Sequence, residues 1–212
     1  MVMTLPPKGV MSQLLFGHDT ELTLRSACAL VNSDRVAGEQ LGAPRDLEAF
    51  LDEYGWTGRR DRDAAELRSV HRLRRRLGAI WAVADDEEKT VELVNALLRD
   101  TRATPWLTRH PEFASSTVAG QRNGLDRQTE WHLHLTAADA PLWQRMGAEI
   151  AMALADLIRA GELRRLKVCA APDCNAVLID LSRNRSRRFC DTGNCGNRQH
   201  VAAYRERRAK AR

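Results

Sequence analysis

The most informative segment of the chain lies between residues 169 and 195, which read CAAPDCNAVLIDLSRNRSRRFCDTGNC. Its four cysteines form two C-x4-C pairs separated by 15 residues, Cys169 with Cys174 and Cys190 with Cys195. Zn²⁺ prefers tetrahedral thiolate sites, and two such pairs can close on one ion. Because four cysteine ligands leave no open position for water, the spacing predicts one structural zinc ion and not a catalytic one.

Disulfide bonds are the main alternative for clustered cysteines. Four of the five cysteines fall within these 27 residues, and the N-terminal sequence lacks the apolar core and cleavage site of an export signal. In such a chain, clustering favours metal over disulfides. Since no run of 18 apolar residues occurs either, we expect a cytoplasmic protein that does not bind membranes. Cys28 falls on a helical apolar stripe and is expected to be a core residue.

The cysteine-rich segment needs its metal to fold. So short a segment buries little apolar surface, and zinc binding worth about 10 kcal/mol supplies the missing stability. Pro172-Asp173 and Gly193-Asn194 provide turns within the two pairs. The alternation in residues 176–181 predicts a strand, and we expect a short hairpin between the two pairs, with treble-clef-like or ribbon-like knuckles.

Positive charge is concentrated in the same part of the chain. Residues 159–212 contain 14 Lys and Arg against 5 Asp and Glu, an excess of nine, whereas the remainder has an excess of four acids. A local excess of this size attracts polyanions, and nucleic acid is the commonest such partner. A solubilising basic tail is the simpler alternative.

A basic helix is predicted after the second cysteine pair, because residues 196–212 have helix-forming composition without proline. Val201 and Tyr204 are expected to pack back on the knuckles, while Arg198, Arg205 and Arg212 follow another face. Arginine suits nucleic-acid contact because its planar fork reaches phosphates or guanine edges bidentately. The predicted contact residues are Arg183, Arg185, Arg187, Arg188, Arg198, Arg205 and Arg208.

The larger N-terminal part, residues 1–162, is predicted to be mostly helical, with residues 163–212 as a zinc-finger domain. The fold class is thus mainly α with a small β-hairpin (α+β). Proline and glycine punctuate residues 104–136 and favour a hairpin there, whose best strand is 129–136. The predicted helices cover 21–31, 46–54, 63–84, a segment from 85–88 to 98, and one from about 139 to 158, ended by Gly161.

Other functions find less support in the sequence. It contains no nucleophile elbow, phosphate-binding glycine-rich loop or HExxH motif, so we do not expect an enzyme. His132 and His134 share a strand face, which a metal site can use, but a wet strand face is the simpler interpretation. A small-molecule effector pocket near Trp56, Trp81, Trp106 or Trp143 and a homodimer are open alternatives, although aromatic residues at helical spacing are more often core.

These features together resemble the CGNR zinc-finger family, whose name is the tetrapeptide present here as Cys195-Gly196-Asn197-Arg198. The match covers about residues 163–208 and includes both cysteine pairs, the Asp180-x-Ser182-Arg183-Asn184 stretch and the basic helix. Two departures are Phe189, where the family often has tryptophan, and His200, where it often has lysine. The resemblance implies zinc and, from the family's basic character, DNA binding.

Members of this family usually join the finger to a helical domain called ABATE, regarded as a stress-induced transcription regulator. Residues 16–159 resemble that domain, notably in Ala29-Leu-Val-Asn32. The resemblance therefore implies a zinc-dependent DNA-binding transcription regulator whose helical domain serves dimerisation or ligand sensing. The alternative is a zinc-stabilised module that binds RNA or a protein partner.

Overall fold

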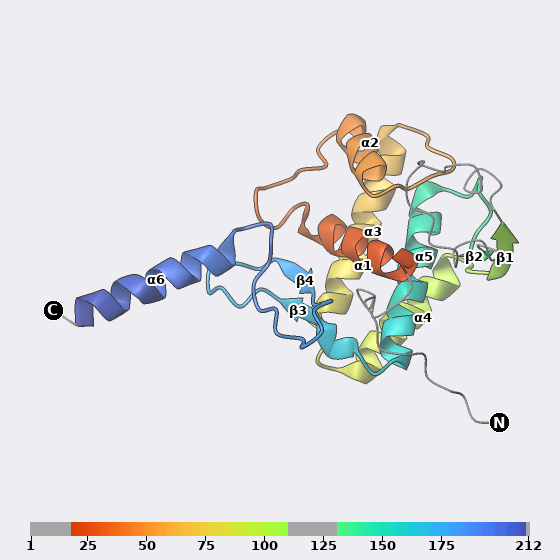
Figure 1. Ribbon diagram of the computed structural model, residues 1–212. Helices are drawn as coiled ribbons and strands as arrows, with labels where there is room; N and C mark the ends of the chain where they lie inside the picture. The colour runs from red at the N-terminus through yellow and green to blue at the C-terminus, as the bar shows by residue number, and fades with distance from the viewer. Residues whose placement is uncertain (1–17, 110–130, 211–212) are drawn as a thin grey trace, which may run out of the picture.

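Five helices form the larger part of the structure, α1 (His18–Asn32), α2 (Pro44–Glu53), α3 (Ala64–Ala82), α4 (Glu87–Asp100) and α5 (Leu142–Arg159) (Figure 1). The computed structural model describes residues 18–109 and 131–210. α1 packs against α3 and α5, α5 also packs against α4, and α2 lies against α3. The helices predicted from apolar periodicity are therefore confirmed. No helix in the described ranges combines the length and apolarity needed to cross a membrane.

Two of these helices begin at aspartate caps. The carboxylate of Asp63 accepts a hydrogen bond from the Glu66 amide (2.8 Å), and that of Asp86 accepts one from the Lys89 amide (3.1 Å). Each bond satisfies an amide that the helix leaves unpaired. The start predicted for α5 at Asp139 is wrong by three residues: Ala140 precedes a proline, which disfavours helical backbone there, and α5 begins after Pro141.

A hairpin follows α4, as predicted. β1 (Trp106–Arg109) pairs antiparallel with β2 (Trp131–His134), and Leu107 lies opposite Leu133. The first two residues of the predicted strand 129–136 lie outside the described residues. The ring of His134 lies beside that of Trp106, with centroids 5.8 Å apart. The structure thus gives His134 an aromatic neighbour across the hairpin.

The second hairpin differs from the prediction. β4 (Val177–Ile179) pairs antiparallel with β3 (Leu166–Val168), which precedes the first cysteine pair. The first pair therefore lies in the hairpin connection, and the expectation of a hairpin between the two pairs is wrong. The reason is burial: Leu166 offers an apolar side chain that the core accepts, whereas residues 182–188 are all Ser, Arg or Asn.

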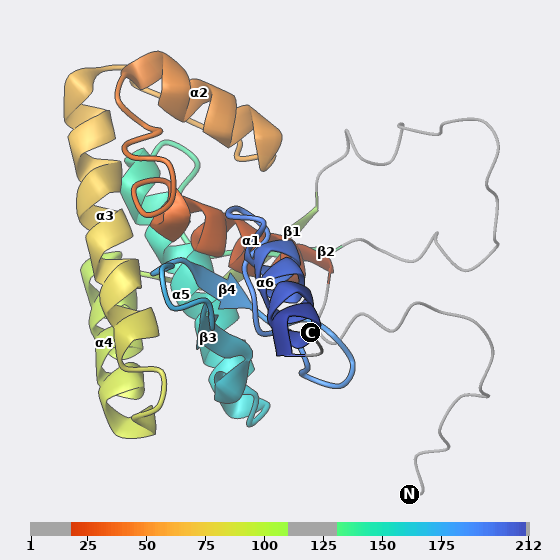
Figure 2. The same cartoon turned by 90° about the vertical axis from the view of Figure 1, so that its left-hand side faces the viewer.

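The helical part and the finger share one hydrophobic core. Leu166 and Ile179 belong to the same buried cluster as Leu24, Leu77 and Leu154 of the helices. β4 packs on α1 and β3 on α3, and Figure 2 shows α1 beside β4 with α6 (Cys195–Lys210) in front. The finger is consequently built onto the helical bundle and is not tethered by a spacer.

A buried asparagine makes two close contacts across this junction. The Asn32 side-chain amide donates to the Val177 carbonyl oxygen, and its own oxygen accepts from the Val177 amide, both at 2.8 Å. The Trp81 indole N–H donates to the Leu178 carbonyl oxygen (3.2 Å), and the Cys28 thiol to that of Val177 (3.3 Å). Asn32 thus occupies the open edge of β4 as a neighbouring strand would.

Replacing Asn32 should weaken the whole structure. We expect Asn32→Ala to lower the free energy of unfolding by about 2–4 kcal/mol, because the Val177 amide and carbonyl are left buried without partners. Urea unfolding of the zinc-loaded chain measures this loss. The matched control is Asn95→Ala at an exposed position of α4; equal stability of the two variants would contradict the role given to Asn32.

Candidate metal centre

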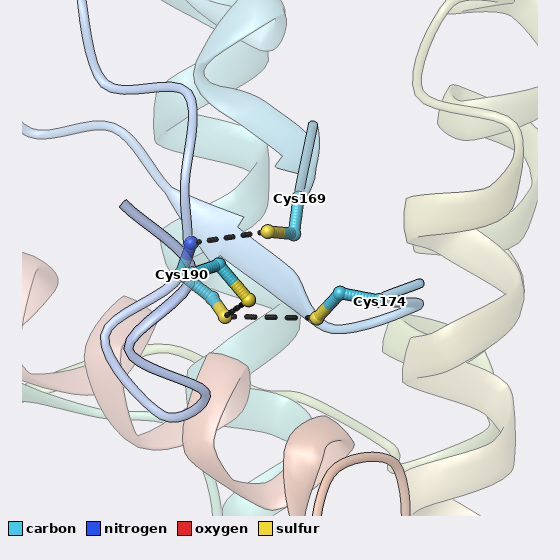
Figure 3. Close-up of side chains that lie close together, drawn as sticks. Cys169, Cys174 and Cys190 are labelled. Carbon is cyan, nitrogen blue, oxygen red and sulfur yellow. Dashed lines mark hydrogen bonds between the residues drawn. The ribbon is translucent and has the colours of Figure 1, made fainter. Parts of the chain in front are cut away.

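The four cysteines of the finger converge on one point. One ligand atom from each of Cys169, Cys174, Cys190 and Cys195 lies within 4.8 Å of all the others. The Cys190 sulfur is 3.7 Å from the sulfurs of both Cys174 and Cys195. A tetrahedral site with Zn–S bonds of about 2.3 Å requires sulfurs about 3.8 Å apart. Figure 3 shows the sulfurs of Cys169, Cys174 and Cys190 turned toward one another, so the geometry fits zinc.

Local backbone structure sets these positions. Cys169 follows β3, and its amide donates to the Ala176 carbonyl oxygen (2.8 Å). Asn194 takes a left-handed conformation (φ 48°), which turns the chain into α6 (Cys195–Lys210). A Cβ on Gly193 would lie 3.0 Å from the Cys195 sulfur and 3.5 Å from that of Cys190. The second pair therefore needs glycine at this position because the sulfurs approach the backbone closely.

Hydrogen bonds to sulfur tune the centre. The Cys190 amide donates to the Cys169 sulfur (3.4 Å), and the Arg198 guanidinium donates to the Cys195 sulfur (3.1 Å). The Arg198 contact lowers the pKa of the Cys195 thiol, whereas burial raises the pKa of Cys190 to about 12. Zinc takes thiolates, so metal binding must release the protons that burial retains.

Arg198 also links the two cysteine pairs. Its guanidinium donates to both carboxylate oxygens of Asp173, at 2.8 and 3.5 Å, and Asp173 lies inside the first pair. Cys195, whose sulfur accepts the third bond, belongs to the second pair. The arginine of the CGNR tetrapeptide thus holds the metal site together, a role that sequence reasoning missed.

The loop between the pairs is organised around Asp180, which is fully buried. Its carboxylate accepts hydrogen bonds from Lys167 Nζ (2.6 Å), Ser182 Oγ (2.6 Å) and the Arg187 amide (2.9 Å). Burial alone would raise the pKa of Asp180, but these bonds outweigh burial and hold the pKa at about 2. The short spacing Asp-x-Ser is the one sequence signal of this loop.

The seven predicted contact arginines divide into two groups. Arg185 pairs with Glu162, and Arg187 with Asp191, as Arg198 pairs with Asp173. Arg183, Arg188, Arg205 and Arg208 are exposed and form no ion pair with another residue in 18–109 or 131–210. Arg188 lies over the Phe189 ring and Arg208 over that of Tyr204, each with 5.9 Å to the ring centroid.

α6 does not fold back on the knuckles. Its one buried residue is Cys195, and Figure 1 shows the helix leaving the body with the C-terminus at its far end. Val201 is 47% exposed and Tyr204 54% exposed, so the expectation that they pack on the knuckles is wrong. Only the first turn reaches the metal centre, because the helix axis points outward from Cys195. Arg212 lies outside the described residues.

The described tryptophans do not line the cavities near the finger. Trp56 and Trp81 are core residues, Trp106 is 40% exposed on the first hairpin, and neither described cavity is lined by tryptophan. The core interpretation of Trp56 and Trp81 is therefore confirmed. Phe189, the departure from the family's usual tryptophan, packs partly buried against the small cluster around the cysteines.

Removing the metal should unfold the loops that carry the cysteines and release the base of α6. A Cys195→Ser chain is expected to lose its zinc, because zinc needs all four thiolates in this closed site. Cys28→Ser, outside the cluster, should keep one ion per chain. Atomic emission spectroscopy gives the stoichiometry, and chelation should reduce the far-UV circular dichroism of α6. Full zinc retention by Cys195→Ser would contradict the four-cysteine site.

The Arg198 guanidinium should affect zinc affinity, because it contacts both cysteine pairs. Arg198→Lys keeps the charge but cannot reach Asp173 and the Cys195 sulfur together, so zinc affinity should fall about tenfold or more. Competition with a chromogenic chelator measures the affinity. Arg205→Lys on the exposed face of α6 is the control and should bind zinc as the parent does.

Two family models match the chain. Residues 165–208 match the CGNR zinc finger, and residues 24–161 match ABATE, described as "Putative stress-induced transcription regulator". A search of curated proteins found no match. The four clustered cysteines lie within the zinc-finger match, so the finger holds one structural zinc ion. Because the second match spans more than half of the chain, the protein belongs to the ABATE family and carries a CGNR zinc finger.

Proposed function

We propose that this protein is a zinc-dependent DNA-binding transcription regulator. The finger and α6 contact DNA, and the helical part, residues 1–162, serves dimerisation or ligand sensing. The family descriptions, a transcription regulator and a zinc finger, support this function. The two matches stop on either side of the proposed boundary between residues 162 and 163.

The strongest support is α6 itself. Its sixteen residues extend about 24 Å at 1.5 Å per residue, and every residue from Val201 to Lys210 is exposed. A helix without a packed face gains little from its own protein and is marginal in isolation. Binding to a partner along its length supplies the missing stabilisation, and a DNA major groove about 12 Å wide admits one helix.

The charges of α6 favour a polyanion as the partner. Arg198, Arg205 and Arg208 fall on one side of the helix, since at about 100° per residue Arg205 lies about 20° and Arg208 about 80° from Arg198 around the helix axis. Arg205 and Arg208 have no acidic partner among residues 18–109 and 131–210. Arg183 and Arg188, also exposed, add two cations from the loop between the pairs. These four arginines are therefore the proposed phosphate contacts.

Salt dependence tests this interface. If the four arginines engage about four phosphates, the logarithm of the binding constant should fall with that of salt concentration with a slope of roughly −3.6. Arg205→Ala combined with Arg208→Ala should make the slope less steep by about two. The matched control replaces Arg68 and Arg75, two exposed arginines of α3, with alanine. A flat slope in the parent chain would contradict an arginine–phosphate interface.

Sequence specificity needs a separate measurement. Zinc-loaded protein is incubated with sheared DNA of its source organism at physiological salt, and retained fragments are sequenced against a Cys190→Ser, Cys195→Ser control. Enrichment of a discrete site, lost in the control, is the expected result. Uniform weak retention of the fragments would count against DNA and favour RNA or a protein partner. Tighter binding of structured RNA than of duplex DNA at the same salt concentration would favour RNA.

A further inference from the structure

A cavity of about 250 Å³ lies at the junction between the helical part and the finger. Its walls come from three places: Arg25 and Cys28 of α1, Tyr54 at the end of α2, and the finger, through β4 and the loop with Arg187 and Asp191. At about 30 Å³ per water-sized group, this volume holds roughly eight non-hydrogen atoms. The cavity therefore suits a small molecule.

The charged groups of the cavity favour an anion. Arg25 and Arg187 contribute two positive charges, and Asp191 contributes one negative charge. The Arg25 side chain is 52% exposed and stands 4.0 Å from Glu21, a long ion pair. Asp191 pairs with Arg187 but is itself 86% exposed, so water weakens its hold on the guanidinium. A ligand carboxylate can therefore compete with Asp191 for the Arg187 guanidinium.

The remaining walls are uncharged and combine polar with apolar side chains. Ala29, Val177 and Ile179 line the cavity. Burial raises the pKa of the Cys28 thiol to about 11 and also raises the pKa of the Tyr54 hydroxyl, so both stay protonated at neutral pH. Neither group repels an anion, and such a wall takes a small apolar body.

We propose that this cavity binds a small organic carboxylate with an apolar body, its carboxylate held by Arg25 and Arg187 and its apolar part against Ala29 and Ile179. A single carboxylate matches the net charge of the lining, one positive unit. The apolar walls favour an organic acid over a free inorganic anion, which would leave them in contact with water.

The position of the cavity connects its occupant to the finger. Asp191 and Thr192 lie between the ligands Cys190 and Cys195, the second of which begins α6. A carboxylate that binds Arg187 breaks the ion pair between Arg187 and Asp191. Because Asp191 lies in the loop that leads into α6, binding in the cavity changes a contact at the base of that helix. This regulatory step rests on the proposed function, whereas binding of the acid does not.

Calorimetric titration of the zinc-loaded full chain with benzoate tests the site. Benzoate should bind with a dissociation constant of about 1 mM or lower, and benzamide and inorganic phosphate should bind at least tenfold more weakly. Arg25→Gln should weaken benzoate binding about tenfold. Ala29→Leu should weaken it by filling the cavity, and Arg75→Gln, an exposed α3 position of equal charge change, should not.

Equal binding of benzoate and benzamide, no binding of benzoate, or an Arg75→Gln effect equal to that of Arg25→Gln would overturn the assignment. The coupling is measured separately, as the DNA affinity of the parent chain with and without benzoate, compared with Arg25→Gln. A benzoate effect on DNA affinity that Arg25→Gln abolishes supports it. A DNA affinity that does not change when benzoate is bound refutes the coupling. Absence of DNA binding refutes the proposed function and leaves the titration result intact.

Discussion

The two hydrogen bonds between the Asn32 side chain and the Val177 backbone are the constraint on which the rest of the structure depends. They fix the outer edge of β4 to α1, and β4 in turn carries β3, whose end presents Cys169. The position of the metal centre is thus determined by a helix of the other part. Zinc fixes the loops beyond it, and the shared core fixes the hairpin beneath it.

Patterns that are local in sequence predicted the structure well. The cysteine spacing identified all four residues of the cluster, and apolar periodicity located the five helices, because both depend on residues a few positions apart. The partner of β4 was missed because strand pairing depends on which apolar side chains the core accepts. Leu166 stands among Arg164, Arg165 and Lys167, and nothing nearby in sequence shows that it is buried.

The arginines illustrate the same limit at the candidate interface. Composition reveals an excess of positive charge, but it does not show which arginines form ion pairs within the protein. Arg185 meets Glu162 across 23 residues, and Arg198 meets Asp173 across 25. Such pairs appear only once the fold brings the segments together. The exposure of Val201 and Tyr204 likewise depends on the direction in which α6 leaves Cys195, which helical periodicity does not contain.

Cys195 is both part of the metal centre and the first residue of α6, and this gives the helix an electrical polarity. Four thiolates and one Zn²⁺ leave two negative charges at its N-terminal end, where the helix dipole is positive and stabilises them. Arg205, Arg207, Arg208 and Lys210 place positive charge at the opposite end. Positive charge is therefore concentrated in the outer turns of α6, at the end of the helix where the dipole is negative, and it strengthens the attraction of these turns for any polyanion.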